Sequence, residues 1–473
     1  MSYFRNLIQK INPFQTRAFY SGAKKSSANK DFWNANTPFE QTAISERDTL
    51  RARARWLSAN NPIMGNIDNS FITNVVGKGI SLQARTADKA LNDEIESRFK
   101  AWCRRCDITE RLHFFDVQKM VYLNRMVDGE IFIYKKIVKG ELKLQILEAD
   151  AIDGTEGENG LTLDVNGKVT HYNFLDKNQN KIKIKSELVI NFCKLERPTQ
   201  YRGVSEYKRA ILDIKNFSAY QSSTVLNARA NAEIAYTIET ERSNEMFGAT
   251  PQDGSDEELH DINGLMVYYL KAGEKINKHS NSFGAGYDDF ITSTVRMIAS
   301  ARCISYELAF KDYSKVNFAS SRASIIQDNK KFDDEQIHIA TYLLDDIYRA
   351  WLEVEVLKTG IIAPVKFEAE KSTYLKCNWA FPRRVWVDPK KELDAIEKEI
   401  KLNLTTETDI CSQMGLEYED ILKTKQKENE LKKSYGILSD FDEEILIKKA
   451  SQYNKQESSN DDIEEVEDAK TTD

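Results

Sequence analysis

The sequence predicts a mixed α+β fold in which antiparallel strands are inserted among long helices. Apolar residues recur first at helical spacing, then with a period of two between about residues 129 and 195, and at helical spacing again in the C-terminal third. No internal repeat, heptad array or low-complexity linker separates these regions. The 473 residues allow about three compact units of ~100–200 residues each.

Three helices are expected before the strands. Residues 43–57 carry apolar side chains at spacings of three and four, with arginines on the other faces. A second helix is expected from about Ala87 to Trp102, and a third over 116–127. The third ends at Asp128-Gly129, which is a turn signal.

Short apolar or alternating runs then predict one antiparallel sheet unit over about 129–195. The runs are separated by Lys-Gly, Asn-Gly and Asp-Gly pairs, which favour turns. The expected strands are 130–134, 142–146, 161–165, 169–173 and 188–192. The loop 196–203 ends the unit.

A long helix is expected after this loop, with Ser205 as its N-cap. Its apolar stripe consists of Tyr207, Ala210, Ile211, Ile214 and Phe217. The pattern fades at 228–232, and strands are expected at 234–239 and 265–270 with a polar surface loop, 241–264, between them.

The C-terminal third is predicted to be helical. Two long helices, 287–310 and 320–358, flank a polar joint over 311–321. Asp388 as a cap and Pro389 in the first turn are favoured at the start of a further helix. Short helices are expected from there to about Lys449.

Composition and charge restrict the class of protein. Hydrophobic residues make up 41% and charged residues 30%, an ordinary globular balance. No stretch reaches the ~18 apolar residues of a membrane helix, and the start lacks the apolar core of a secretory signal. The sequence therefore predicts a soluble intracellular protein that does not enter a membrane.

The net charge of -7 argues against a protein that grips nucleic acid tightly, because such proteins usually carry a strongly basic domain. Contact with nucleic acid would be loose, or made by a local patch or a symmetric assembly. A basic arm over 1–39 and an acidic tail over 450–473 flank the chain. The tail is expected to be disordered, since it cannot bury enough apolar area.

The sequence lacks the common catalytic signatures. It has no phosphate-binding loop, no GxSxG and no HExxH, and its five histidines are scattered. Cys103 and Cys106 have no second CxxC, so free buried thiols are favoured over zinc. Adjacent acids such as Asp345-Asp346 are more consistent with solvated helix faces than with a metal site. By elimination we expect a structural or interaction protein without enzyme activity, cofactor or metal.

Four stretches in order resemble the lambda-type family of tailed-phage portal proteins, over about residues 40–425. They are Leu50–Asn61 with Val75–Gln83; Arg197-Pro-Thr-Gln-Tyr-Arg-Gly-Val-Ser205; Arg296–Ser300 with Ser305–Leu308, Asp312–Asn317 and Ser320–Ala323; and Trp379–Pro382 with Val387–Glu392, Leu404–Thr406 and Gly415.

The sequence departs from the family pattern in three places. Ala301-Arg302-Cys303 stands where the family tends to have Gly-Leu-Gly, which predicts a more continuous helix here. Phe318 replaces a usual Tyr. Asn403 replaces a usual Gly, and Asn tolerates the left-handed backbone that a turn there requires.

The resemblance implies a ring of about twelve copies at one vertex of a phage capsid. Double-stranded DNA would pass through its channel, driven by a separate terminase, and a head–tail adaptor would dock on it. Major capsid and scaffolding proteins are implied as further partners. The protein would assemble in the host cytoplasm and remain in the virion. The alternatives are another capsid or tail component and, less favoured, a terminase-type packaging enzyme, which would need a phosphate loop.

The family fold has an outer wing, a helical stem, a small α/β clip and a helical crown. Mapped onto this chain, the expected regions are a wing (40–204), stem helices (205–232 and 287–311), a clip (233–286), a channel loop (312–321), a long helix returning to the wing (322–375) and a crown (376–449).

Lys311 and Lys315 are the candidate DNA-guiding residues of the joint. The equally weighted alternative is a plain interhelix turn, with Asp312, Asn317 and Ser320 as structural and capping residues. Arg322 is expected at a subunit interface or in a buried ion pair. The cluster before Asp388-Pro389 resembles an interface hot spot, with core packing as the alternative. Its residues are Trp379, Phe381, Arg383, Arg384 and Trp386.

Overall fold

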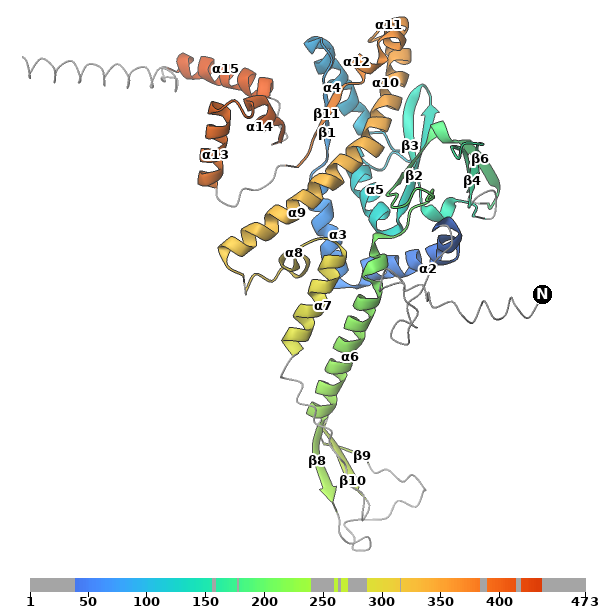
Figure 1. Cartoon of the computed structure of the whole chain (residues 1–473), viewed down its shortest axis with the longest axis vertical. Helices are drawn as coiled ribbons and strands as arrows, with labels where there is room; N and C mark the ends of the chain where they lie inside the picture. Colours follow the sequence, from blue (N-terminus) through green and yellow to red (C-terminus); the bar gives the residue numbers. More distant parts are fainter. Residues whose placement is uncertain are drawn as a thin grey trace, which may run out of the picture.

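A computed structural model describes residues 39–154, 159–176, 178–239, 259–262, 265–270, 287–314, 316–382, 389–413 and 418–435. In this part of the chain, long helices are combined with four small sheets (Figure 1), so the predicted α+β class is confirmed. Nearly all of the basic arm 1–39 and the whole acidic tail 450–473 lie outside the described residues.

Four helices form the N-terminal part: α2 (Phe39–Asn60), α3 (Pro62–Val75), α4 (Lys89–Cys103) and α5 (Phe114–Asp128). Helix α3 was not among the predicted helices, although its start carries a clear signal. Asn61 is its N-cap, and the Asn61 side chain accepts hydrogen bonds from the backbone of Ile63 and Met64, both at 3.1 Å. The other three helices agree with the predicted ranges to within a few residues.

The strands between residues 129 and 195 form two three-stranded antiparallel sheets rather than one. The first has the order β3-β2-β7, from β2 (Glu130–Val138), β3 (Glu141–Leu147) and β7 (Val189–Cys193); the second has the order β4-β5-β6, from β4 (Leu161–Leu163), β5 (Val169–Leu175) and β6 (Lys181–Lys185). The rings of Phe132, Tyr172 and Phe174 pack between them. Strand β6 was not among the predicted strands, although its alternation of lysine and isoleucine has the period of two that is typical of a strand.

A two-stranded sheet joins distant parts of the chain. Strand β1 (Ser81–Ala84) pairs antiparallel with β11 (Cys377–Ala380), which places Leu82 opposite Trp379. The C-terminal region therefore begins inside the main body, where the rings of Phe99, Tyr348 and Trp379 share one hydrophobic core.

The predicted long helix begins at Ser205 as expected. The Ser205 side chain accepts a hydrogen bond from the backbone N–H of Tyr207, capping a 3-10 turn (Glu206–Arg209) that leads into α6 (Ile211–Glu233). All five residues of the predicted apolar stripe are buried. Figure 1 shows α6 running away from the body beside α7 (Tyr287–Ala301).

A small mixed sheet lies at the far end of α6 (Figure 1). Strand β10 (Leu265–Leu270) pairs in parallel with β8 (Ile234–Glu239) and antiparallel with β9 (Leu259–Ile262). The predictions of β8 and β10 are confirmed. Strand β9 lies in the range expected to be a loop, so that expectation is wrong at 259–262.

The expected continuous helix over 287–310 is wrong. It ends at Ala301, and Cys303 takes a left-handed backbone with φ 57°. The Ser305 side chain then accepts a hydrogen bond from the backbone N–H of Leu308 and caps the short helix α8 (Tyr306–Phe310). The helix breaks here although no glycine is present: Cys303 itself takes the left-handed conformation, at a position where the family usually has glycine.

One long helical path follows the joint. It consists of α9 (Phe318–Ile339), a π-helical turn (Ala340–Leu344) and α10 (Asp345–Thr359), where the sequence predicted a single helix. Short helices α11 (Pro364–Ala369) and α12 (Lys371–Tyr374) complete this part. No helix of the described residues has the length and apolar character needed to cross a bilayer.

Three helices end the described part of the chain: α13 (Pro389–Lys401), α14 (Glu407–Gln413) and α15 (Tyr418–Ser434). The left-handed backbone predicted at Asn403 is confirmed, with φ 55°. Helix α15 meets α4 through the ion pairs Lys89–Glu419 and Lys423–Asp93.

Candidate functional site

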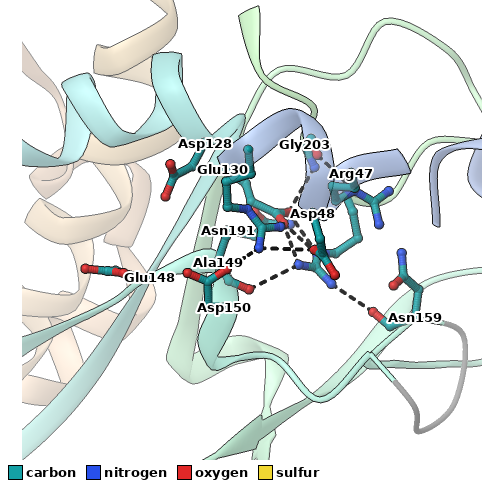
Figure 2. Close-up of polar contacts among 12 residues, drawn as sticks. Arg47, Asp48, Asp128, Glu130, Glu148, Ala149, Asp150, Asn159, Asn191 and Gly203 are labelled. Carbon is teal, nitrogen blue, oxygen red and sulfur yellow. Dashed lines mark hydrogen bonds and ion pairs between the residues drawn. The ribbon is translucent and has the colours of Figure 1, made fainter. Parts of the chain in front are cut away.

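The loop before α6 forms the first half of the candidate site. In this loop, Arg202 Nε donates to both carboxylate oxygens of Glu130, at 2.8 and 2.9 Å. The backbone N–H of Gly203 donates to the same carboxylate at 2.9 Å. Figure 2 shows this carboxylate at the centre of the polar contacts. The start of β2 is thereby fixed to the residues that lead into α6.

Helix α2 contributes three arginines to the same place. Arg47, Arg51 and Arg55 are spaced four apart and share one face of the helix. Arg47 donates to the carbonyl oxygen of Gly203 at 3.1 Å, Arg51 pairs with Asp150, and Arg55 Nε donates to Asp128 at 2.8 Å. These three arginines, of which Arg51 and Arg55 belong to the first family-like stretch, thus hold α2 against the sheet and the loop.

Two glycines allow the loop and the sheet to approach closely. A Cβ on Gly203 would lie 2.1 Å from the carbonyl oxygen of Gly129, and a Cβ on Gly129 would lie 2.3 Å from the carbonyl carbon of Val204. Gly129 also has a left-handed backbone with φ 94°. We call this region, from Arg47 to Gly203, the stem-base junction.

A buried charge cluster lies behind the junction and forms the second half of the site. The members come from α5, β7 with its following residue, the 3-10 turn, the end of α7, and α9. They are Arg125, Lys194, Glu206, Arg302, Lys331 and Glu335. Arg125 pairs with Glu206 and Glu335, and Arg302 Nη1 lies 2.8 Å from Glu206 Oε2. Each of these five elements therefore contributes at least one charge.

The cluster keeps its acids ionised. Burial would raise the pKa of Glu335, but the positive charges of Arg125, Lys194 and Lys331 outweigh it and hold that pKa well below its ordinary value. The pKa of Glu206 is lowered in the same way by Arg125 and Arg302. The ion pairs are consequently intact at neutral pH.

His338 lies one helical turn after Glu335, just before the π-helical turn. Its ring packs on Phe192 and Tyr342, with centroids 5.2 and 4.9 Å away. Burial, together with the charges of Arg125 and Lys194, lowers the pKa of His338 to about 4. The imidazole is therefore neutral next to the cluster at physiological pH.

The polar joint between α8 and α9 is a capped turn. Lys311 ends α8 with a left-handed backbone, φ 57°, and its side chain is exposed. The Asp312 carboxylate accepts hydrogen bonds from Ser314 N at 3.0 Å and from the Tyr306 hydroxyl at 3.1 Å. Lys315 lies outside the described residues.

The N-cap of α9 is Asn317. Its side chain accepts the backbone N–H of Ser320 at 2.8 Å. The alternative interpretation expected Ser320 to be a capping residue. Ser320 instead lies inside the first turn and supplies the N–H that Asn317 caps. The geometry accounts for Asp312 and Asn317 as turn residues and leaves Lys311 directed to solvent.

The family comparison agrees with the resemblance found in the sequence. The model of the family described as "Phage portal protein, lambda family" matches residues 25–336. The chain belongs to this family. The matched portal region contains the stem-base junction, the joint and all members of the buried charge cluster.

Two curated portal proteins are similar to the chain. The "Probable portal protein" of Halomonas phage phiHAP-1 is 24% identical over 445 residues, which cover 84% of this chain and 83% of the relative. "Portal protein B" of Escherichia phage lambda is 22% identical over 262 residues, covering 50% of this chain and 49% of the lambda protein.

Solved structures from gene transfer agent (GTA) particles are also similar. The chain from "Neck of empty GTA particle computed with C6 symmetry" is 11% identical with a TM-score of 0.44, covering 78% of this chain and 94% of that one. The chain from "Neck of native GTA particle computed with C12 symmetry" is 11% identical with a TM-score of 0.40, covering 78% and 93%.

One interface candidate of this portal protein packs in the core of its own chain. Trp379 is buried in β11, its Nε1 donates to Asp345 Oδ1 at 2.7 Å, and its ring packs on Phe99 and Tyr348. Because the indole packs on its own chain, the structure favours the core alternative for Trp379, and its place in a subunit interface stays a prediction. Phe381, next to it, is half-buried against the same core.

The other interface candidates stay predictions. Arg322 is half-buried in α9 and forms no ion pair with a residue that the structure describes. Pro389 is the first residue of α13, as expected for proline at a helix start. The remaining candidates lie outside the described residues: Arg383, Arg384, Trp386 and Asp388.

The cysteine pair is buried and carries no disulfide. Cys103 and Cys106 are both free thiols, and burial raises the pKa of Cys106 to about 12, which makes the thiolate inaccessible at neutral pH. Among the described residues, no three His, Cys, Asp or Glu side chains gather closely enough to hold a metal ion.

Proposed function

We propose that about twelve copies of this portal protein close into a ring at one capsid vertex. The ring would be the channel through which double-stranded DNA enters and leaves the head. Terminase would dock on it during packaging and a head–tail adaptor afterwards, with major capsid and scaffolding proteins around it. Assembly would take place in the host cytoplasm, and the ring would remain in the virion. Family membership supports this proposal, because the family is one of structural portal proteins.

The observation that carries the ring is the exposed apolar face of the α6–α7 pair. The two helices pack on each other through Tyr220 and Phe290, with ring centroids 4.3 Å apart. A different face of α6 carries Leu212 and Leu226, which are 67% and 64% exposed and fourteen residues apart. On α7, Met297 is 55% exposed. A two-helix projection with exposed apolar side chains on both helices is expected to be covered by neighbouring copies.

The regions follow the family plan. In this proposal the wing is 40–204, the stem helices are 205–232 and 287–311, the clip is 233–286, and the long helix 322–375 returns to the wing. In the clip, the described residues are the strands β8, β9 and β10. Within the expected crown, 376–449, strand β11 belongs to the main body, so the proposed crown consists of α13, α14 and α15.

The proposed ring guides DNA electrostatically without gripping it. A cyclic arrangement converts one lysine facing the axis into a girdle of positive charge, whereas the overall charge of -7 limits tight binding. Lys311, exposed at the end of α8, and Lys315 in the same joint are the proposed guiding charges. Arg322 is proposed to lie at a subunit interface. The chain is proposed to carry out no chemical step of its own.

Imaging by negative-stain electron microscopy tests the ring. A hollow ring of about a dozen subunits is expected, and a monomer that turns over ATP would overturn both the ring and the absence of enzyme activity. Images of an assembly without a central channel would support the alternative function, another capsid or tail component.

Packaging tests the guiding lysines. We expect the double variant Lys311→Ala, Lys315→Ala to change the rate or length of DNA packaged at low salt. The matched control is Lys183→Ala, Lys185→Ala on the exposed strand β6, which should leave packaging unchanged. If both double variants package DNA equally, Lys311 and Lys315 do not guide DNA. The proposal of a ring would still stand.

A further inference from the structure

A cluster of cations lies where the C-terminal end of α4 meets the β2–β3 hairpin. The segments 98–111 and 135–143 carry nine Lys or Arg against three acids, a net charge of +6 in a chain whose total is -7. The exposed members are Lys100, Arg104, Arg105, Arg111 and Lys139. We call these five residues the basic corner.

Contacts between the two segments show that the basic corner is one surface. The Lys143 ammonium donates to the carbonyl oxygen of Arg105 at 2.6 Å and to Glu110 at 2.9 Å, and Arg105 lies 3.3 Å from Glu141. The pKa of Glu110 is lowered by Lys143 first and also by Lys139 and Arg105. The acids within the corner are therefore already paired, and positive charge remains in excess.

The helix end does not account for this excess. The C-terminus of a helix carries roughly half a negative charge, which one cation can balance. Lys100, Arg104 and Lys139 form no ion pair with any residue that the structure describes. Ile137, on the same hairpin, is 67% exposed. A surface that carries these three cations beside an exposed apolar side chain fits an acidic peptide segment.

We propose that the acidic segment 457–468 of this same chain docks on the basic corner. The segment holds seven acids and no Lys or Arg, with Ile463 and Val466 among them. Its charge complements the corner, and its apolar residues match the exposed Ile137. The inference does not depend on the ring and concerns a surface that the proposed function leaves unused.

The chain is long enough for this contact. Helix α15 meets the N-terminal half of α4 at Lys89 and Asp93. The 17 residues of α15 and the 15 of α4 place the corner at most about 50 Å from Ser434, at 1.5 Å per helical residue. The 22 residues from 436 to 457 extend to about 75 Å. The segment therefore reaches the corner without moving either helix.

Carbodiimide cross-linking of the full chain, followed by mass spectrometry, tests the contact. The reagent joins carboxylates to lysine amines that lie close to them. We expect links from the segment to Lys100 and Lys139 several-fold more often than to Lys183 and Lys185, which are also exposed, on β6. Links should decline in about 1 M salt, where the Debye length is about 3 Å. An even spread over all four lysines, or no link to the corner, overturns the proposal.

Charge reversal provides the matched variants. Arg104→Glu with Arg111→Glu keeps both reporter lysines and should reduce their links several-fold, whereas Lys183→Glu with Lys185→Glu should leave them unchanged. Mixing isotopically labelled and unlabelled chains before assembly shows whether the cross-linked segment and the lysine belong to the same chain or to two different chains. Links within one chain support the proposal, and links between labelled and unlabelled chains replace it with docking on a second copy.

Discussion

Arg125 and Glu335 form an ion pair that is completely closed to solvent. The Arg125 Nη2 lies 2.6 Å from Glu335 Oε2, and both side chains are 0% exposed, although 210 residues separate them in the sequence. The pair joins α5 of the proposed wing to α9, which follows the joint. Its position means that α5 and α9 cannot move apart without breaking this pair and leaving a buried charge without its partner.

Removing the carboxylate should therefore be strongly destabilising. We expect Glu335→Gln to lower the free energy of unfolding by about 3–5 kcal/mol, because Arg125 and its neighbours would be left buried without their counter-charge. Urea denaturation measures the change. The control Asp334→Asn, on the exposed side of the same turn, should cost less than about 0.5 kcal/mol. An equal decrease in the free energy of unfolding in both variants would show that the buried ion pair contributes no more to stability than an exposed charge.

His338 should make stability depend on pH between its unfolded and folded pKa values. Its pKa falls from 6.5 to about 4 on folding, so the unfolded chain binds a proton at a pH where the folded chain does not. The free energy of unfolding should then decrease as the pH falls from about 6.5 towards about 4. We expect His338→Gln to flatten this part of the profile. A profile with unchanged slope in the variant would contradict the assignment.

The close approach at the stem-base junction predicts a severe effect of a single methyl group. Gly203→Ala should lower stability by about 3 kcal/mol or more, because the new Cβ would overlap the carbonyl oxygen of Gly129. Gly140 is the matched control. It has φ 75° but open space around it, so Gly140→Ala should cost only the left-handed strain of about 1–2 kcal/mol. Thermal unfolding of both variants checks the order, and a larger loss at Gly140 would refute it.

The helix break at Cys303 predicts a stabilising substitution. Cys303→Gly should raise the free energy of unfolding by about 1 kcal/mol, because glycine adopts φ 57° without the cost that a side chain incurs. Three residues earlier, Ser300→Gly lies inside α7 and should lower stability by about 0.5–1 kcal/mol. Opposite signs in the two variants are the expected result. Destabilisation by Cys303→Gly would contradict the left-handed backbone.

Periodicity predicted the elements whose burial follows a simple rule. The stripe from Tyr207 to Phe217 is buried as expected, because a single helix face packs on the body. Asn403 is left-handed as expected, since asparagine tolerates that backbone. The break at Cys303 could not be predicted in this way, because a cysteine carries no local signal for a left-handed turn.

The buried charge cluster was missed for a different reason. Charged residues are normally exposed, so Arg125 and Glu335 were assigned no role. A signal was present in the spacing, since Glu335 lies three residues after Phe332 and four before Ile339, on the buried face of α9. Its partners come from elements far apart in the sequence, and only the folded chain brings them together.

The molar mass in solution tests the central claim most directly. Light scattering on the purified protein should give about 650 kDa, twelve times the 54.4 kDa of one chain. Leu226→Glu, on the exposed face of α6, should reduce the assembled fraction, while Val165→Glu, fully exposed just after β4, should not. A mass of 54.4 kDa for the unmodified chain at high concentration would contradict the account.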